Sequence, residues 1–186
     1  MASTFDPARA VRLDFPRGTA LASDDARLVL LPATALTELA FEASPELRLT
    51  LGKAIGASLG ARVATRLGGT EGASKAPPES FLNELGAEIA ASGLGRLGLE
   101  RWGRALIVTL ENSAVEDDAI LAGIVGAALA TATGKDTHAV QLVSERGDVK
   151  LLITSRGTAE QVRGWLADGS TFMGVLEKLH AAESVR

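Results

Sequence analysis

Apolar residues recur at every fourth position between residues 44 and 69, which is the spacing of one face of a helix. The row consists of Leu47, Leu51, Ile55, Leu59, Val63 and Leu67. Ser44 before the row is a good N-cap, and Pro45 suits the first helical position. Gly68 and Gly69 follow the row and favour a helix end. The pattern predicts one long helix over residues 45–67.

Other segments repeat the helical spacing, whereas two regions alternate as strands do. Helices are predicted over residues 34–41, 79–91, 119–132, 158–166 and 172–179. The alternating regions, residues 97–110 around Gly103 and residues 139–154, predict two β-hairpins. A short N-terminal hairpin is expected from residues 11–15 and 27–31. The polar segment 70–78 favours a flexible loop.

This order predicts an α+β fold in one domain. Two hairpins flanking a helix favour a four-stranded antiparallel sheet with helices packed on one side. A short N-terminal hairpin lies in an extension over residues 1–45, the core covers 46–155, and a C-terminal helical pair follows over 156–186. We expect that pair to cover an edge of the sheet or, alternatively, to bind a partner.

Composition excludes several function classes. The 186 residues include no cysteine and two histidines, and the net charge is −4. Thiol catalysis and cysteine-based metal sites are therefore excluded. An acidic chain with 4% aromatic residues does not favour nucleic-acid binding. The most apolar stretch, residues 119–132, is too short to span a bilayer, and residues 1–10 lack a signal-peptide pattern, so we expect a cytoplasmic protein.

Two catalytic-looking motifs lie in unsuitable places. Gly56–Gly60 matches the G-x-S-x-G motif of hydrolases, but Ser58 falls within the predicted long helix and not at a strand-to-helix turn. Gly93–Gly98 matches a dinucleotide-binding pattern, but here a helix precedes the motif and a strand follows it. His138 and His180 have no carboxylates at a metal-ligand spacing. We therefore expect no enzyme activity, metal or cofactor, and an esterase using Ser58 ranks last among the alternatives.

Gly52, Gly56 and Gly60 form a spaced series on the long helix. Three glycines inside a helix cost roughly 3 kcal/mol relative to alanine unless they serve packing. They predict a groove that a second backbone can approach closely. Its occupant is a helix of the same chain, a helix of a second subunit or the alkyl chain of a ligand. The apolar row is turned away from the groove, so the helix is expected to pack on more than one side.

The region from Leu47 to Ser155 resembles the 4-vinyl reductase domain, a relative of the transport-protein-particle (TRAPP) subunits. The resemblance rests on residues 51–67 with their spaced glycines, 92–113, 121–135 and 139–153, and on the order of the elements. It implies a helical dimer, and functions as a scaffold for small GTPases or as a receptor for small hydrophobic molecules. Family members often carry cysteines near the second hairpin, and this chain has none.

The main functional hypothesis is a non-enzymatic scaffold that dimerises through the face containing Gly52, Gly56 and Gly60 and acts with another protein, such as a small GTPase. The alternative is a sensor that holds a small hydrophobic ligand between the helices and the sheet. The residues predicted to line that pocket are Leu106, Val108, Ile124 and Val125.

Overall fold

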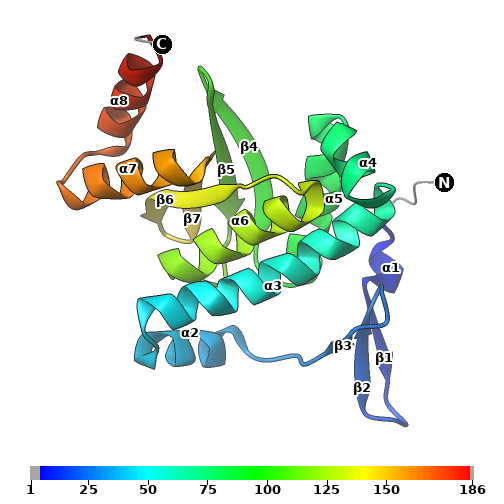
Figure 1. Ribbon diagram of the computed structural model, residues 1–186. Coiled ribbons are helices and arrows are strands. Elements are labelled where there is room, and N and C mark those ends of the chain that lie inside the picture. Colours follow the sequence, from blue (N-terminus) through cyan, green and yellow to red (C-terminus); the bar gives the residue numbers. More distant parts are fainter. Residues whose placement is uncertain (1–4, 185–186) are drawn as a thin grey trace.

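The structure is a computed structural model and describes residues 5–184, which form helices around two antiparallel sheets (Figure 1). The helices are α1 (Pro7–Ala10), α2 (Ala33–Glu42), α3 (Pro45–Arg66), α4 (Gly69–Lys75), α5 (Pro78–Ala91), α6 (Asp118–Thr133), α7 (Arg156–Ala167) and α8 (Phe172–Ser184). The strands are β1 (Val11–Asp14), β2 (Thr19–Ala22), β3 (Arg27–Leu28), β4 (Arg96–Trp102), β5 (Ala105–Glu111), β6 (His138–Glu145) and β7 (Asp148–Thr154).

The larger sheet confirms the predicted four-stranded antiparallel arrangement. Its strands lie in the order β4-β5-β7-β6, so each predicted hairpin contributes two neighbouring strands. Strands β5 and β7 join the hairpins, with Val108 opposite Leu151. Between the hairpins, α6 begins at the N-cap Asp117, whose side chain accepts a hydrogen bond from the Ile120 amide, and it ends at Gly134 in the left-handed conformation.

Helices cover both faces of this sheet. Successive side chains of β5 point to opposite faces, so they pack into two separate hydrophobic cores. Val108 and Leu110 pack with α3, α5 and α6 on one face. Ile107 points to the other face and packs with α7 and α8. The C-terminal pair therefore covers much of a face, whereas we had expected it to cover an edge. Figure 1 shows α7 and α8 on the side of the sheet away from α3.

The N-terminal region has three strands instead of the two expected. Strand β1 pairs with β2, which the pattern had not predicted, and β2 pairs with β3. The predicted strand over residues 27–31 is only two residues long, because Val29 to Leu31 continue as an extended segment without strand pairing. This small sheet lies at one end of α3 (Figure 1).

Two local predictions were wrong. In one, burial in the core stabilises a helix where a loop was expected, and in the other a different residue caps the helix. The segment 70–78, expected as a loop, contains α4. An ion pair between Lys75 and Glu71 spans one turn of α4, and Ala73 is buried in the main core. Helix α7 begins at Arg156 and not at Thr158, because Ser155 takes the N-cap position.

The predicted apolar row on α3 is buried only in its second half. Leu59 and Val63 lie in the core, but Leu47 and Leu51 are exposed. Steps of four residues exceed the 3.6-residue turn, so each step rotates the row by about 40° around the axis. The row therefore winds from the outer side of α3 to the side that faces the core.

A cluster of four charged side chains joins α3 to α5. Nε of Arg62 lies 2.8 Å from Oε2 of Glu88, and Nε of Arg66 lies 2.6 Å from Oε2 of Glu84. Nη1 of Arg66 also contacts Oε1 of Glu88 at 2.5 Å. All four side chains are at most 10% exposed. Such buried charges are tolerated because each has an opposite partner within hydrogen-bonding distance.

The N-terminal segment closes over this cluster. The Phe5 amide donates to Oε1 of Glu84 at 3.2 Å, and the Phe5 ring lies 5.2 Å from the Arg66 guanidinium carbon. Asp24, between β2 and β3, approaches Nη1 of Arg62 at 3.9 Å. The same charges that join the two helices therefore also attach the N-terminal sheet.

The glycine series of α3 lies against α6 of the same chain. A Cβ built on Gly52, Gly56 or Gly60 would overlap a carbonyl oxygen of α6, that of Ile120, Ile124 or Ala128 in turn. These three pairs are all 68 residues apart in the sequence, so the two helices run parallel. Helix α6 fills the groove, and no second subunit can occupy it while α6 is there.

We expect Gly56→Ala to destabilise the protein by about 2 kcal/mol, because overpacking against backbone outweighs the better helix propensity of alanine. The matched control is Gly164→Ala in α7, where a new Cβ meets nothing within 4 Å; it should stabilise by up to about 1 kcal/mol. Urea unfolding followed by circular dichroism measures both. Equal free energies of unfolding for Gly56→Ala and the unaltered chain would contradict the close backbone contact.

Candidate functional site

The four residues predicted to line a ligand pocket lie on the side of the sheet that α3, α5 and α6 cover. Val108, Ile124 and Val125 are each at most 2% exposed and belong to one packed core cluster. Leu106 is half-buried near the end of the sheet, opposite Ile153 on β7. None of the cavities described below is lined by any of the four, so their role as a pocket stays a prediction.

A groove follows the side of α6 that neither α3 nor the sheet fully covers. It is lined by small residues such as Ala122, Gly126 and Ala127, together with the charged side chains of Lys53 and Arg156. Its volume is about 540 Å³. The groove is open to solvent, so it offers little enclosure to a small molecule.

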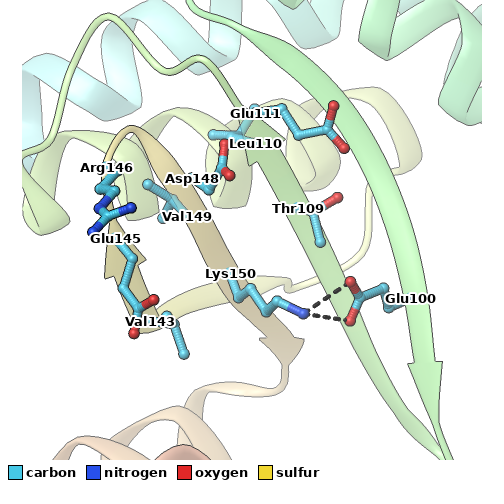
Figure 2. A pocket seen from close by; sticks show the side chains of 10 residues that line it. All are labelled: Glu100, Thr109, Leu110, Glu111, Val143, Glu145, Arg146, Asp148, Val149 and Lys150. Atoms are coloured by element: carbon cyan, nitrogen blue, oxygen red, sulfur yellow. Dashed lines mark hydrogen bonds and ion pairs between the residues drawn. The ribbon is translucent and has the colours of Figure 1, made fainter.

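The uncovered part of the sheet's other face forms an open, charged hollow of about 810 Å³ (Figure 2). Glu100 of β4 and Lys150 of β7 face each other across β5, and Figure 2 shows both carboxylate oxygens directed at the Lys150 ammonium. Glu111, Glu145 and Asp148 add negative charge around the hollow. This composition is typical of a solvated sheet face and is unsuited to an apolar ligand.

Glu100 connects this sheet face to α8. Its two oxygens lie 2.9 Å and 2.8 Å from Nζ of Lys150, and the second also accepts a 2.9 Å hydrogen bond from Nε1 of Trp102. The hydrogen bond from Lys150, followed by that from Trp102, lowers the pKa of Glu100 below its ordinary value of 4.5. The Phe172 ring, at the start of α8, meets the Trp102 ring edge-on at 5.6 Å and lies 5.8 Å from Nζ of Lys150.

A smaller and more enclosed cavity, of about 250 Å³, lies between the sheet and the C-terminal helices; we call it the α7/α8 cavity. Leu152 of β7 and Ala105 of β5 contribute from the sheet. Trp165 of α7 and Leu179 and His180 of α8 contribute from the helices. The cavity therefore has walls from three parts of the chain that are distant in sequence.

Polar groups around the α7/α8 cavity supply both charge and hydrogen bonds. Arg104, in the turn between β4 and β5, brings a guanidinium group to its lining. Thr158 and Gln161 of α7 bring a hydroxyl and an amide. An indole and an imidazole beside aliphatic side chains, with a few polar groups, form a lining whose chemistry suits a small ring carrying a polar substituent. A volume of about 250 Å³ accommodates one such ring.

His180 is positioned by the tip of the first hairpin. Gly103, with φ of +62°, lies directly beneath the imidazole, and a Cβ at this position would overlap the ring. A glycine here therefore serves both the left-handed turn and the close approach of α8. The sequence indicated only a turn at Gly103, and for His180 it indicated only that no metal-ligand spacing surrounds it.

Sequence reasoning missed the α7/α8 cavity because its lining residues do not share a motif. Trp165 falls within the predicted helix over residues 158–166, but the sequence assigned no binding role to it, to Arg104 or to Gln161. One available signal was that Trp165 and His180 lie in the predicted C-terminal helical pair, outside the region that the resemblance covered. Their meeting depends on α7 and α8 returning over the sheet.

Ser58 and His138, two of the candidate residues from the sequence, each pair with a side chain of the same element or the adjoining loop. Ser58 is within α3, and its Oγ accepts a hydrogen bond from Nη1 of Arg62 at 2.9 Å. His138 pairs with Asp136 at 3.0 Å. Over residues 5–184, no group of three or more potential ligating side chains could hold a metal ion. In the same range, no helix is both long and apolar enough to cross a membrane.

We expect Lys150→Met to raise the pKa of Glu100, because it removes the hydrogen bonds that contribute most to lowering it. A carboxyl group whose pKa is lowered by folding stabilises the fold above its unfolded pKa, and this contribution is lost as the pH falls. NMR titration of the glutamate carboxyl carbons measures the shift. Lys75→Met, which removes the exposed pair with Glu71, is the control and should leave Glu100 unchanged. An unchanged Glu100 pKa in Lys150→Met would contradict the assignment.

Comparison with known proteins shows the fold. No family model matches the chain, and no curated protein matches it in sequence. Among solved structures, the chain is similar to the phenol-responsive sensory domain of the transcription activator PoxR, crystallised with phenol. The TM-score is 0.61 at 17% sequence identity, over 86% of this chain and 92% of that chain. The described α+β architecture is thus shared with a ligand-responsive domain along nearly its whole length.

Proposed function

We propose that this chain is a sensory domain that binds a small, single-ring aromatic compound in the α7/α8 cavity. The observation that carries the proposal is the lining of that cavity, where Trp165 and His180 stand beside Leu152 and the guanidinium group of Arg104. The fold shared with a phenol-responsive sensory domain supports it, because that domain binds a ligand of the same size class. The proposal assigns binding to the cavity and no reaction.

The lining also indicates which ligands would be favoured. Aromatic rings pack well against indole and imidazole faces, in offset or edge-on geometry. A hydroxyl or carboxylate on the ring would meet Arg104 or Gln161 at the rim, and charge-assisted hydrogen bonds are the stronger kind. Phenols and aromatic acids therefore fit the site better than saturated rings or alkanes of equal size.

Helix α8 is the element through which binding would be sensed. It is attached to the sheet by Phe172 at its start, by the buried Val175 and Leu176, and by His180 over Gly103. A ligand that touches Leu152, Trp165 and His180 together would contact the sheet, α7 and α8 at once. Binding energy available only with α8 in place shifts the equilibrium towards the docked helix.

The main hypothesis from the sequence, a scaffold that acts with a small GTPase, stays a prediction, as does a cytoplasmic location. Of the two functional hypotheses, the sensor receives the support of the structural comparison. The sensor site proposed here differs from the one predicted, because it lies on the opposite face of the sheet from Val108 and Ile124.

The test is titration with phenol, using cyclohexanol as a non-aromatic compound of equal size. The chain has two tryptophans and no tyrosine, so a ¹⁵N-labelled sample should show two indole N–H signals. We expect phenol to shift the Trp165 signal more than that of Trp102, with heat released in calorimetry, and cyclohexanol to bind at least tenfold more weakly.

Ala105→Phe should fill the α7/α8 cavity and reduce phenol affinity at least tenfold. The matched control is Val143→Phe, which places the same ring in the open hollow of Figure 2 and should leave affinity unchanged. Thermal unfolding of both variants checks that they fold. Absence of any phenol binding at millimolar concentration would refute the proposed ligand class, and full affinity in Ala105→Phe would refute the proposed site.

A further inference from the structure

The polar side chains that line the α7/α8 cavity offer more hydrogen-bond donors than acceptors. Arg104 and Trp165 carry N–H donors and no acceptor. Thr158, Gln161 and His180 can each donate as well as accept. None of the described residues that line the cavity is an aspartate or a glutamate. A polar group of a bound ligand is therefore matched best if it accepts hydrogen bonds.

The charge of the cavity lining differs from that of its surroundings. The open hollow of Figure 2 lies on the same face of the sheet, and four carboxylates line it, against the two cations of Arg146 and Lys150. The whole chain has a net charge of −4. A cavity lined by a guanidinium group and no carboxylate is thus a local exception on an acidic molecule. Lining charge of one sign raises the local concentration of ligands of the opposite sign.

The guanidinium group of Arg104 is available to a ligand. Arg104 is exposed in the turn between β4 and β5, directly after Gly103, which lies against the imidazole of His180. Among residues 5–184, no ion pair or hydrogen bond joins the Arg104 side chain to another residue, whereas Arg62 and Arg66 are held by buried glutamates. A ligand that binds Arg104 therefore displaces no partner among the described residues.

We propose that the ligand of the α7/α8 cavity is a single-ring aromatic acid, whose carboxylate binds Arg104 while its ring lies beside Trp165 and Leu152. This inference rests on the proposed function and makes Arg104 the residue that selects the charge of the ligand. An ionised carboxylate only accepts hydrogen bonds, and its two oxygens match the planar fork of a guanidinium group. A neutral ring alcohol also brings an O–H donor, which needs an acceptor that Arg104 and Trp165 do not have.

Benzoate and benzyl alcohol test the charge preference, because they share a ring and differ in the charge of the attached group. In calorimetry at neutral pH and low salt, we expect benzoate to bind with a dissociation constant at least tenfold lower than that of benzyl alcohol. Added salt should weaken benzoate binding and leave benzyl alcohol binding unchanged, because salt screens the interaction of exposed charges.

The outcomes separate this inference from the proposed function. Benzyl alcohol or phenol binding as tightly as benzoate, or more tightly, would overturn the inference and leave the proposed function intact. Absence of binding by all three compounds would overturn both.

Arg104→Met tests the assigned residue, because it removes the charge and keeps an extended side chain. We expect benzoate affinity to fall at least tenfold and benzyl alcohol affinity to stay unchanged. The matched control is Arg101→Met, since Arg101 is also exposed but alternates with Glu100 on β4 and so points to the opposite face of the sheet. It should alter neither affinity. Thermal unfolding verifies that both variants fold.

Gln161→Glu provides a converse test, because it adds a carboxylate to the cavity lining with almost no change in shape. It should weaken benzoate binding at least tenfold and give benzylamine a higher affinity than it has for the unaltered chain. A benzoate preference that survives in Arg104→Met, or that falls equally in Arg101→Met, would overturn the assignment of Arg104.

Discussion

The close backbone contact between α3 and α6 is the constraint on which the rest of the fold depends. Helix α6 lies between α3 and the sheet, and nine of its sixteen residues are buried. Side chains at Gly52, Gly56 or Gly60 would move α3 outwards and open the core that holds Leu59 and Val63. Backbone-to-backbone packing of this kind gains dispersion contacts and Cα–H···O contacts that larger residues would prevent. These contacts offset the loss of helix propensity that the three glycines cause.

The opposite face of the sheet is packed in a different way. It is covered only in part, by two helices that join the sheet through aromatic and polar contacts as well as aliphatic ones. Trp102, Phe172 and Lys150 form one such attachment, and His180 over Gly103 forms another. Between them the side chains do not close completely, which leaves the α7/α8 cavity. A tightly packed face provides the stability of the domain, and a loosely covered face contains the cavity proposed as the ligand site.

The sequence predicted those helices and strands whose signals, such as alternation, turn glycines and N-caps, lie within a short stretch of the chain. The hairpin at Gly103 follows from alternation and a turn glycine, and α6 from its acidic N-cap and final glycine. Helix α4 and strand β2 were missed, because Ala73 and Ala22 are held by burial in the folded chain and carry weak signals of their own. The α7/α8 cavity could not be predicted, since it depends on Trp165 and His180 meeting strands far away in sequence. The glycine series predicted a close contact correctly, although not which of three partners would fill it.

The buried charges between α3 and α5 have a consequence for behaviour on heating. Hydration of charged groups becomes less favourable as temperature rises, so the cost of keeping Arg62, Arg66, Glu84 and Glu88 away from water falls. Hydrophobic stabilisation per unit area levels off over the same range. The attachment of the N-terminal sheet, which rests on this cluster through Phe5 and Asp24, is therefore expected to hold at temperatures where the lightly anchored α8 has already separated. Warming would loosen the domain from its C-terminal end first.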